Sequence, residues 1–580
     1  MADYQHLNSA EAAVKQAEQV ERQATVHVDC GDWCGSVERI WTSLGYDELN
    51  WTYTPTGKRA LKTIGAFAEH PYYVRPHYIF MSGIGWSLPH WGAGNVYHED
   101  ATGTPFYDFA IADQVYDAIV NAGHRPLVEL AFTPRTLVPS EAQFPFEPSP
   151  TQWSTYEAGL WSFPPADYAK WGDLVHALVQ HCVERYGLDE VQHWLWELWN
   201  EPDIFYWRGT AEQYYALYDV TAGAVKSAFA DAKVGGPATT GDLARNGPTF
   251  LRGFLRHCAE ARTPLDFVSF HTKGAYFTPW RVYGPLGGPA PTPQSPSMLK
   301  MLREVREGLR AVGEHQEFRD LPCIVDECDA SVPAHWGIYD NANFAYRNTE
   351  YYAVFQCKLM KKLLDLNNVS EAHVAQATTW SFYFEGERFF EGTRSLFTAG
   401  AIEKPVLNAY RLLARLGDTR LRVESSAAWP LERLDDGDAG MPEEVDALAT
   451  FSGRDSVAIL VWRHADDQHL TDQTEIDVAL RIERLPFEGN SVHIRHWRID
   501  GQHSNSYSAW QAAGAPQDPS PGQLHAIRER QGLELYEPDR VEPLRDGSLV
   551  LHVRLPLPSV ALIELHAAVR PPEQGGSAIA

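Results

Sequence analysis

Short apolar runs alternate with amphipathic segments from about residue 36 to residue 419. The apolar runs predict strands at 39–45, 72–80, 125–132, 192–200, 233–236, 265–272, 322–327 and 374–384. Apolar residues at helical spacing predict helices at 55–67, 107–122, 165–186, 211–230, 248–260, 298–312, 348–364 and 405–416. Each strand is followed by a helix, which predicts an α/β fold, a (β/α)8 TIM barrel with long insertions after its strands. An open doubly wound sheet is the alternative, but Gly83-Ile84-Gly85 leads into a loop and is a weak match to a phosphate-binding turn.

The helical spacing stops after about residue 420, where strand-like runs are separated by turn residues. These runs lie at 457–462, 475–482, 492–499 and 559–565, and they predict an all-β sandwich domain. We expect a helical extension at 1–23, a strand at 24–35 that joins the sandwich, the barrel at 36–419, the sandwich at 420–566 and a disordered tail at 567–580.

Composition narrows the class of partner. A formal charge of −27 argues against nucleic acid or an anionic membrane surface. The chain has no run of 18 or more apolar residues and no secretory signal, so we expect it in the cytoplasm. Its seven scattered cysteines lack zinc-ligand spacing and are interpreted as reduced thiols, and we expect no metal and no cofactor. The 19 Trp and 26 Tyr could stack on sugar rings.

The aromatic stretch 192–207 places a carboxylic acid where its strand ends. Pro202 lacks an N–H and stops the ladder, so Glu201 is delivered at the strand's C-terminal edge. Reactive groups of such barrels lie at these edges. The other strand ends carry Arg75, His77, Phe132, Asn200, His271, Lys273, Asp326, Glu327, Trp380, Glu385 and Glu387. Two glutamates among imidazoles, an amide and aromatic rings suit hydrolysis of a glycosidic bond, which needs one carboxylic acid and one carboxylate.

Structural explanations compete with this interpretation. Glu201 could simply cap a core strand, and Glu327 lies in an acidic run with Asp326 and Asp329 that could be a solvated turn. A lone histidine is usually a satisfied core residue, which applies to His77 and His271. Glu327 directly ends an apolar strand, however, and the histidines end strands that face the same mouth, so we favour function.

The chain resembles glycoside hydrolase family 39, the bacterial β-xylosidase family. The motifs that carry the resemblance are VRPHYIF (74–80), GHRPLVELAF (123–132), LWNEPD (198–203), DFVSFHTKG (266–274), CIVDE (323–327), TWSFYFE (379–385), EKPVLNAYRLL (403–413) and HSNSYSAWQAAGAPQDPSPGQ (503–523). An Asn-Glu-Pro alone is common among barrel glycosidases, whereas the ordered set is specific and spans nearly the whole chain after about residue 36.

The resemblance implies a retaining, double-displacement mechanism with Glu201 as general acid/base and Glu327 as nucleophile. It further implies these sugar-site roles: Asn200 binds the 2-hydroxyl, His77 and His271 bind the sugar in the −1 subsite, Trp380 forms its floor, and Arg75 keeps the nucleophile ionised. The two carboxyl groups should then lie about 5–5.5 Å apart, against roughly 6.5–9.5 Å in an inverting enzyme.

Some positions depart from the family's common pattern. Lys273 replaces a frequent Tyr, Tyr78 stands where a smaller residue is common, and 385–388 differs from the usual acidic pair. Lys273 could contact a substrate carboxylate, as in a uronic acid, or pair with Glu327 or Glu385. Phe132 and Trp207 could line the sugar pocket or merely close it.

These patterns predict an exo-acting β-xylosidase that trims xylo-oligosaccharides, without a nucleic-acid or membrane partner. A same-fold exo-glycosidase for α-L-arabinopyranosyl, β-galactosyl or uronic acid residues is the nearest alternative. A non-catalytic sugar-binding protein is the alternative from another class. The oligomeric state and the role of the β domain stay open, and an oligomer is compatible with the sequence.

Overall fold

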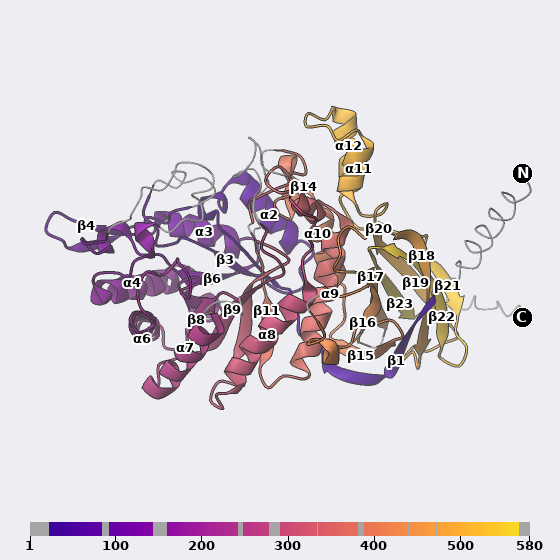
Figure 1. Cartoon of the computed structure of the whole chain (residues 1–580), viewed down its shortest axis with the longest axis horizontal. Coiled ribbons are helices and arrows are strands. Elements are labelled where there is room, and N and C mark those ends of the chain that lie inside the picture. The colour runs from indigo at the N-terminus through magenta and orange to yellow at the C-terminus, as the bar shows by residue number, and fades with distance from the viewer. Residues whose placement is uncertain are drawn as a thin grey trace, which may run out of the picture.

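The computed structural model describes residues 23–83, 92–142, 159–241, 247–277, 291–332, 334–380, 388–437, 440–453, 455–470 and 472–567. Two sheets organise these residues, one closed by parallel pairing and surrounded by helices, the other built mostly of antiparallel strands (Figure 1). The predicted helical extension at 1–23 and the predicted tail at 567–580 lie almost entirely outside the described residues.

The first sheet is a closed barrel. Its strands are β2 (Ser43–Tyr46), β3 (Tyr73–Pro76), β6 (Arg125–Leu130), β7 (Leu195–Leu198), β8 (Lys233–Thr239), β9 (Phe267–Lys273), β10 (Pro322–Asp329), β11 (His373–Ala377) and β12 (Thr379–Trp380). The last two are separated by Thr378 alone and share the eighth position. Because β11 pairs with β10 and β12 pairs with β2, the parallel sheet closes on itself. The predicted (β/α)8 fold is confirmed.

One major helix follows each barrel position. These helices are α2 (Pro55–Gly65), α3 (Ala110–Val120), α4 (Tyr168–Tyr186), α6 (Ala211–Ala228), α7 (Gly247–Ala261), α8 (Met298–Gly313), α9 (Glu350–Asn367) and α10 (Pro405–Leu413), with the short α5 (Leu188–Val191) before β7. Local sequence fixes several starts: Thr210 and Gln213 form a capping box on α6, and Asp167 caps α4. Because each helix follows its strand, the helix N-termini lie at the strands' C-terminal end of the barrel.

Some predicted strand bounds are wrong for local reasons. The strand predicted at 72–80 ends at Pro76, which has no N–H for the ladder, and Tyr78 takes a left-handed φ of 70°. The strand predicted at 192–200 is only Leu195–Leu198. The strand predicted at 233–236 instead continues to Thr239. The end of the last predicted strand, 381–384, lies outside the described residues.

The second sheet forms the predicted sandwich. Its strands are β1 (Gln23–Ser36), β15 (Thr419–Ser425), β16 (Glu444–Ser452), β17 (Ser456–His464), β18 (Asp472–Glu483), β19 (Ser491–Ile499), β20 (Glu534–Leu535), β21 (Arg540–Pro543), β22 (Leu549–Leu557) and β23 (Ser559–Ala567). β1 from the chain start lies between β15 and β18, as its indigo colour among orange strands shows in Figure 1. Two hairpins stand outside both sheets: β4 (Tyr97–Glu99) with β5 (Pro105–Tyr107), and β13 (Phe397–Thr398) with β14 (Ile402–Glu403).

Two helices interrupt the β domain between β19 and β20, which the sequence analysis does not predict. They are α11 (Ser506–Ala512) and α12 (Pro521–Glu529), and both project from the sheet in Figure 1. A readable signal marks the second: Ser520 and Gln523 form a capping box, with a proline at the first helical position.

The β domain packs on the barrel through alternate residues of one strand. Ala458, Leu460 and Trp462 of β17 join the barrel's core, whereas Val457 and Ile459 face the interior of the sandwich. At the same interface, Lys362 of α9 is 1% exposed, and its Nζ lies 2.9 Å from Oε2 of Glu444 in β16. The two domains therefore share a continuous, partly charged core.

Candidate active site

β7 delivers Glu201 at the barrel's mouth. All four residues of the strand are buried, and the chain then turns through left-handed residues, Trp199 with φ 70° and Glu201 with φ 47°. The Glu201 N–H donates to the Ala238 carbonyl oxygen at 2.9 Å, which holds this turn against the end of β8. The Glu201 side chain is 14% exposed, so its carboxylate can be reached from outside.

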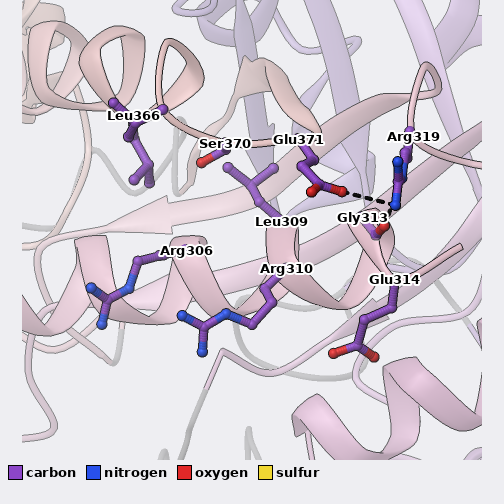
Figure 2. A pocket seen from close by; sticks show the side chains of 10 residues that line it. Arg306, Leu309, Arg310, Gly313, Glu314, Arg319, Leu366, Ser370 and Glu371 are labelled. Atoms are coloured by element: carbon purple, nitrogen blue, oxygen red, sulfur yellow. Dashed lines mark hydrogen bonds and ion pairs between the residues drawn. The ribbon is translucent and has the colours of Figure 1, made fainter. Parts of the chain in front are cut away.

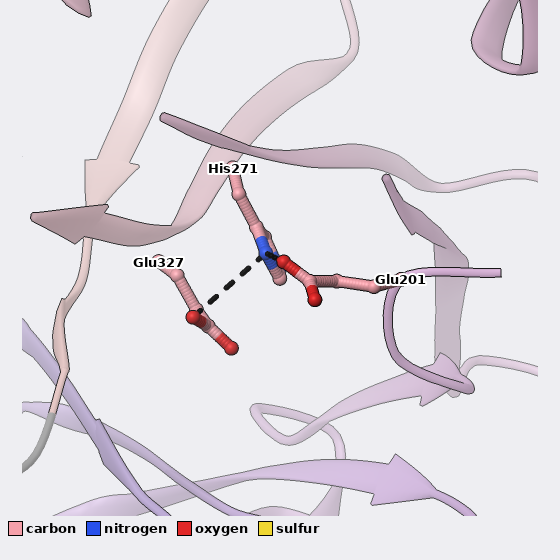
Figure 3. Close-up of side chains that lie close together, drawn as sticks. All are labelled: Glu201, His271 and Glu327. Atoms are coloured by element: carbon pink, nitrogen blue, oxygen red, sulfur yellow. Dashed lines mark hydrogen bonds and ion pairs between the residues drawn. The ribbon is translucent and has the colours of Figure 1, made fainter. Parts of the chain in front are cut away.

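Glu327, near the end of β10, lies beside Glu201. One carboxylate oxygen of each glutamate and one ring nitrogen of His271 lie within 4.8 Å of one another. His271 Nδ1 lies 2.9 Å from Glu201 Oε1 and 3.9 Å from Glu327 Oε2, so the imidazole bridges the two acids (Figure 3). The structure thus brings together the two glutamates that the strand-end pattern singled out.

Four cationic side chains surround Glu327. Lys273 Nζ lies 2.5 Å from its Oε2, while Arg75 Nη1 and His77 Nε2 each lie 3.7 Å from its Oε1. Burial opposes ionisation of Glu327, yet Lys273, His271, His77 and Arg75 outweigh it and hold its pKa well below the usual range. Glu327 is therefore a carboxylate at neutral pH.

Arg75 on β3 has no exposed surface and lies within a shell of acids. Its Nε is 2.6 Å from Glu197 Oε2, and its Nη2 is 3.1 Å from both Glu129 Oε2 and Asp326 Oδ2. Nη2 also donates to Asn200 Oδ1 at 3.1 Å, which orients that amide. Burial disfavours the guanidinium, but these carboxylates raise the pKa of Arg75 above its ordinary value. Glu129 of β6 and Glu197 of β7 are paired in register, and both therefore bind the guanidinium of Arg75.

Both histidines carry raised pKa values. Burial disfavours the imidazolium of His77, but the carboxylates of Glu129 and Asp47 outweigh it and raise the pKa to about 9. Burial acts similarly on His271, where Glu327 and Asp326 raise the pKa to about 10. Both imidazoles therefore favour the protonated, cationic form at neutral pH, and the Nδ1–H of His271 donates to Glu201 Oε1.

Lys273 is held in an ion-pair chain. Besides Glu327 it binds Asp329, which in turn binds Arg394 and accepts a hydrogen bond from the Trp380 N–H at 3.1 Å. Of the partners left open from the sequence, Glu327 is observed and Glu385 lies outside the described residues. Sequence reasoning missed Asp47, Asp329 and Arg394. Asp329 could have been found from its place at the end of β10, whereas no spacing marks Arg394, which lies in a loop.

Aromatic rings form one wall. The Trp380 ring lies 4.2 Å from the His77 ring and 5.2 Å from Arg75 Cζ. It rests on Gly45, where an added Cβ would lie 2.2 Å from Cζ3 of the indole, so this packing requires glycine. Phe132 is 1% exposed, and its ring lies 6.5 Å from the His77 ring.

Trp207 faces a different environment. It is 5% exposed, its ring lies 4.9 Å from Trp199 and 5.7 Å from Tyr214, and its Nε1–H donates to the Thr210 carbonyl oxygen at 2.9 Å. These contacts close the loop after β7, and a contact between Trp207 and substrate stays a prediction.

The cluster of Glu201, His271 and Glu327 has the donor types that a metal ion could use. The ammonium of Lys273 already lies 2.5 Å from Glu327, and His271 Nε2 lies 3.3 Å from Asp326 Oδ2. A cation added here would meet the Lys273 charge and a protonated imidazole, so the donor set suits acid–base chemistry better than metal binding.

A separate cavity of about 460 Å³ lies at the opposite end of the barrel, between the C-terminal half of α8 and the segment after α9 (Figure 2). Arg306, Arg310 and Arg319 line it, and each lies near a carboxylate: Asp435, Glu307 and Glu371 respectively. Figure 2 shows the Arg319–Glu371 pair beside Leu309. Reactive groups of such barrels lie at the C-terminal ends of the strands, so this cavity lies away from the catalytic end.

A closed (β/α)8 barrel with two glutamates at its C-terminal mouth defines a barrel glycoside hydrolase. A family model described as glycosyl hydrolases family 39 matches residues 50–534. The chain therefore belongs to glycosyl hydrolase family 39 and is a glycoside hydrolase.

Known proteins of two activities are similar to the chain. A β-xylosidase of Geobacillus stearothermophilus is 27% identical over 504 residues, 85% of this chain and 86% of that protein. An α-L-iduronidase of Mus musculus is 27% identical over 432 residues, 69% and 62% of the two chains. The crystal structure of a monomeric β-xylosidase from Caulobacter crescentus CB15 superposes with a TM-score of 0.73 at 23% identity, covering 94% and 100% of the chains. Among the described residues, no helix is both long and apolar enough to cross a membrane.

Proposed function

We propose that the protein is a retaining, exo-acting β-xylosidase that releases xylose from short xylo-oligosaccharides. The observation that carries this proposal is the carboxylate separation: oxygens of Glu201 and Glu327 lie within 4.8 Å. That distance is close to the roughly 5–5.5 Å between the carboxyl groups of retaining enzymes. It is well short of the about 6.5–9.5 Å separation at which an inverting enzyme leaves room for a water. The similar β-xylosidases support the sugar.

Glu327 is the nucleophile in this proposal. Its surrounding cations keep it ionised, and it attacks the anomeric carbon to form a covalent glycosyl–enzyme intermediate. As its charge passes into the new ester bond, Lys273 keeps a partner in Asp329, so the ammonium is not left unpaired.

Glu201 is the general acid/base. It protonates the leaving oxygen in the first step and removes a proton from water in the second. The His271 Nδ1–H donates to its Oε1, which leaves Oε2 to carry the transferred proton. His271 is in turn oriented by Asp326 through Nε2.

The sugar ring occupies the space above Trp380. Asn200, whose Oδ1 is held by Arg75, presents its amide N–H to the 2-hydroxyl. His77 and His271 lie beside the sugar in the −1 subsite, with their ring nitrogens already directed at carboxylates. Arg75 positions Asn200 and supports the charge on Glu327. Phe132, Trp207 and Glu385 are the remaining proposed rim residues, with Glu385 outside the described residues.

A panel of nitrophenyl glycosides tests the sugar. We expect turnover of the β-D-xyloside with initial release of the β-anomer by NMR, and loss of turnover in Glu327→Ala. Initial release of the α-anomer would refute the retaining mechanism. Absence of xyloside turnover would refute xylose as the sugar that is released. Absence of turnover of every glycoside in the panel would instead indicate a sugar-binding protein.

A uronoside is the second candidate substrate. Lys273 lies beside the nucleophile, and the buried Arg394 shares Asp329 with it. The similar α-L-iduronidases act on a uronic acid by name. In this case the substrate carboxylate would compete with Asp329 for these cations. The panel decides between the two, because an α-L-iduronide would be preferred over the xyloside. α-L-Arabinopyranosides and β-galactosides complete the panel of substrates.

We further propose that the enzyme works in the cytoplasm on imported oligosaccharides. All seven cysteines are unpaired, and six of them are buried, which suits a reducing compartment. Size-exclusion chromatography with light scattering would determine the oligomeric state.

A further inference from the structure

A second cavity lies on the mouth side of the barrel. It has a volume of about 600 Å³ and lies between the loop after β6, the loop after β7, and the first turns of α4 and α6. Phe163, Tyr168, Arg208, Glu212 and Gln213 are among its lining residues. Because the helix N-termini lie at the C-terminal ends of the strands, this cavity shares the barrel end of Glu201 and Glu327.

Packed side chains connect the cavity to the active site. The Phe132 ring lies 4.4 Å from the Trp161 ring, and Trp161 precedes Phe163 by two residues. The Arg208 N–H donates to the Ser162 carbonyl oxygen at 2.8 Å, which ties the β7 loop to the β6 loop. Arg208 follows Glu201 by seven residues, so even a fully extended chain keeps them within about 25 Å.

The chemistry at Glu201 sets which end of the substrate faces this side. The general acid protonates the leaving oxygen, so the leaving part of the substrate lies on the Glu201 side of the broken bond. The loop after β7 connects Glu201 to Arg208, which lines the cavity. We propose that the cavity is a distal subsite that binds the leaving-group end of a neutral oligosaccharide, an inference that rests on the proposed glycosidase function.

The lining has the composition of a sugar site. Phe163 contributes an aromatic ring, and Arg208 Cζ lies over this ring at 5.9 Å from its centroid. Tyr168 contributes a second ring, which is held in place because its O–H donates to the Gln213 carbonyl oxygen at 2.9 Å. Arg208 and Gln213 donate to hydroxyls, and Glu212 accepts from them. Both charge signs are present, which favours a neutral ligand, and the volume lies within the range of small-molecule sites.

Prolines make the cavity rigid. Pro139, Pro164 and Pro165 all line it, and their fixed φ angles limit the ordering that a ligand would otherwise impose. The cavity at the other end of the barrel differs, since its lining residues in the described part of the chain include three arginines and no aromatic ring. Its Arg310, 60% exposed with one partner at 3.3 Å, therefore supplies a matched control for removal of an exposed arginine.

The test compares kcat/KM for 4-nitrophenyl xyloside, xylobiose, xylotriose and xylotetraose in the wild type, Phe163→Ala, Arg208→Ala and Arg310→Ala. We expect kcat/KM to rise with chain length in the wild type and in Arg310→Ala. In the two cavity variants the values for the longer substrates should fall about three- to tenfold, the worth of one stacking contact, while the nitrophenyl substrate is unchanged.

Calorimetry measures the binding of xylotetraose without turnover. The two proteins compared are the inactive Glu327→Ala variant and the same variant that also carries Phe163→Ala. Weaker binding by about threefold or more in the double variant supports the proposal. A rise with chain length that survives both cavity variants, no rise at all, or an equal loss on every substrate would overturn it. Absence of any xyloside turnover would refute the proposed function instead, and the calorimetry would still decide the subsite.

Discussion

Lys273→Met removes the cation nearest to the proposed nucleophile while keeping a side chain of similar volume. Lys273 Nζ lies 2.5 Å from Glu327 Oε2, and Lys273 is 5% exposed, so solvent screens the pair little. Asp329 keeps Arg394 as its partner, so the substitution chiefly changes the field at Glu327.

The magnitude follows from the distances. The other cations lie 3.7 Å, 3.7 Å and 3.9 Å from Glu327 oxygens, so by inverse distance Lys273 supplies about a third of the attraction. Because a close opposite charge lowers a carboxyl pKa by about 1–3 units, we expect the variant to raise the pKa of Glu327 by about 1–2 units. That shift corresponds to about 1.4–2.7 kcal/mol.

The sign follows from the direction of the present shift. A carboxyl with a lowered folded pKa stabilises the protein above its unfolded pKa of about 4.3, and this stability is lost as pH falls through the folded pKa. The variant should therefore unfold more easily in urea at pH 7. The acid limb of its kcat/KM profile should move up by about 1–2 units, because Glu327 must be ionised to attack.

The assay is kcat/KM for a nitrophenyl glycoside from about pH 2 to 9, with urea unfolding beside it. Lys170→Met is the matched control, since Lys170 pairs with Glu99 at 2.8 Å but is 30% exposed and lies outside the site. An acid limb in Lys273→Met that coincides with the wild type would refute the electrostatic account, whatever happens to kcat.

Further predictions concern the acid, a histidine and the domain interface. Glu201→Ala should lower kcat/KM for xylobiose by about 10²–10⁴-fold but lower it less for nitrophenyl xyloside, whose leaving group needs less protonation; equal losses would contradict the acid role. His77 has a pKa raised to about 9, so its stabilisation is complete below about pH 6.5 and lost as pH rises through about 9. Urea unfolding of His77→Gln should show a shallower decline across that window. Lys362→Met should lower the free energy of unfolding by about 3 kcal/mol, because it removes a buried partner of Glu444. Exposed Lys62→Met, the control, should change it by less than about 0.5 kcal/mol.

The hydrophobic periodicity was enough to predict the barrel, because its strands are buried and each pattern is contained in a short stretch of the chain. Each predicted strand overlaps an observed one, and caps such as Asp167 and Thr210 start helices where the sequence indicates. The errors in the predicted barrel strands fall at strand ends, where a single residue can decide where the pairing stops. Pro76 ends β3 early, so His77 reaches the mouth from a turn rather than from a strand.

The ion-pair web around the site could not be predicted from the sequence. Glu129 and Glu197 are far apart in the chain, yet both bind Arg75 because β6 and β7 are adjacent in register and lie close to β3. Arg394 reaches Asp329 from a loop with no periodic signal. Strand pairing decides which of several carboxylates a buried cation contacts, and the spacing of residues along the chain does not specify that pairing.

The sequence by itself determined the barrel, the β domain and the glutamates that end strands on one rim, among which the family resemblance selects Glu201 and Glu327. These follow from local hydrophobic period and from residues that stop a strand or start a helix. Only the tertiary structure decided that Glu201 and Glu327 lie within 4.8 Å with His271 between them, and that Lys273 pairs with Glu327. The physical reason is closure of the sheet: β12 pairs with β2, so residues distant in the chain meet at angstrom range around one mouth.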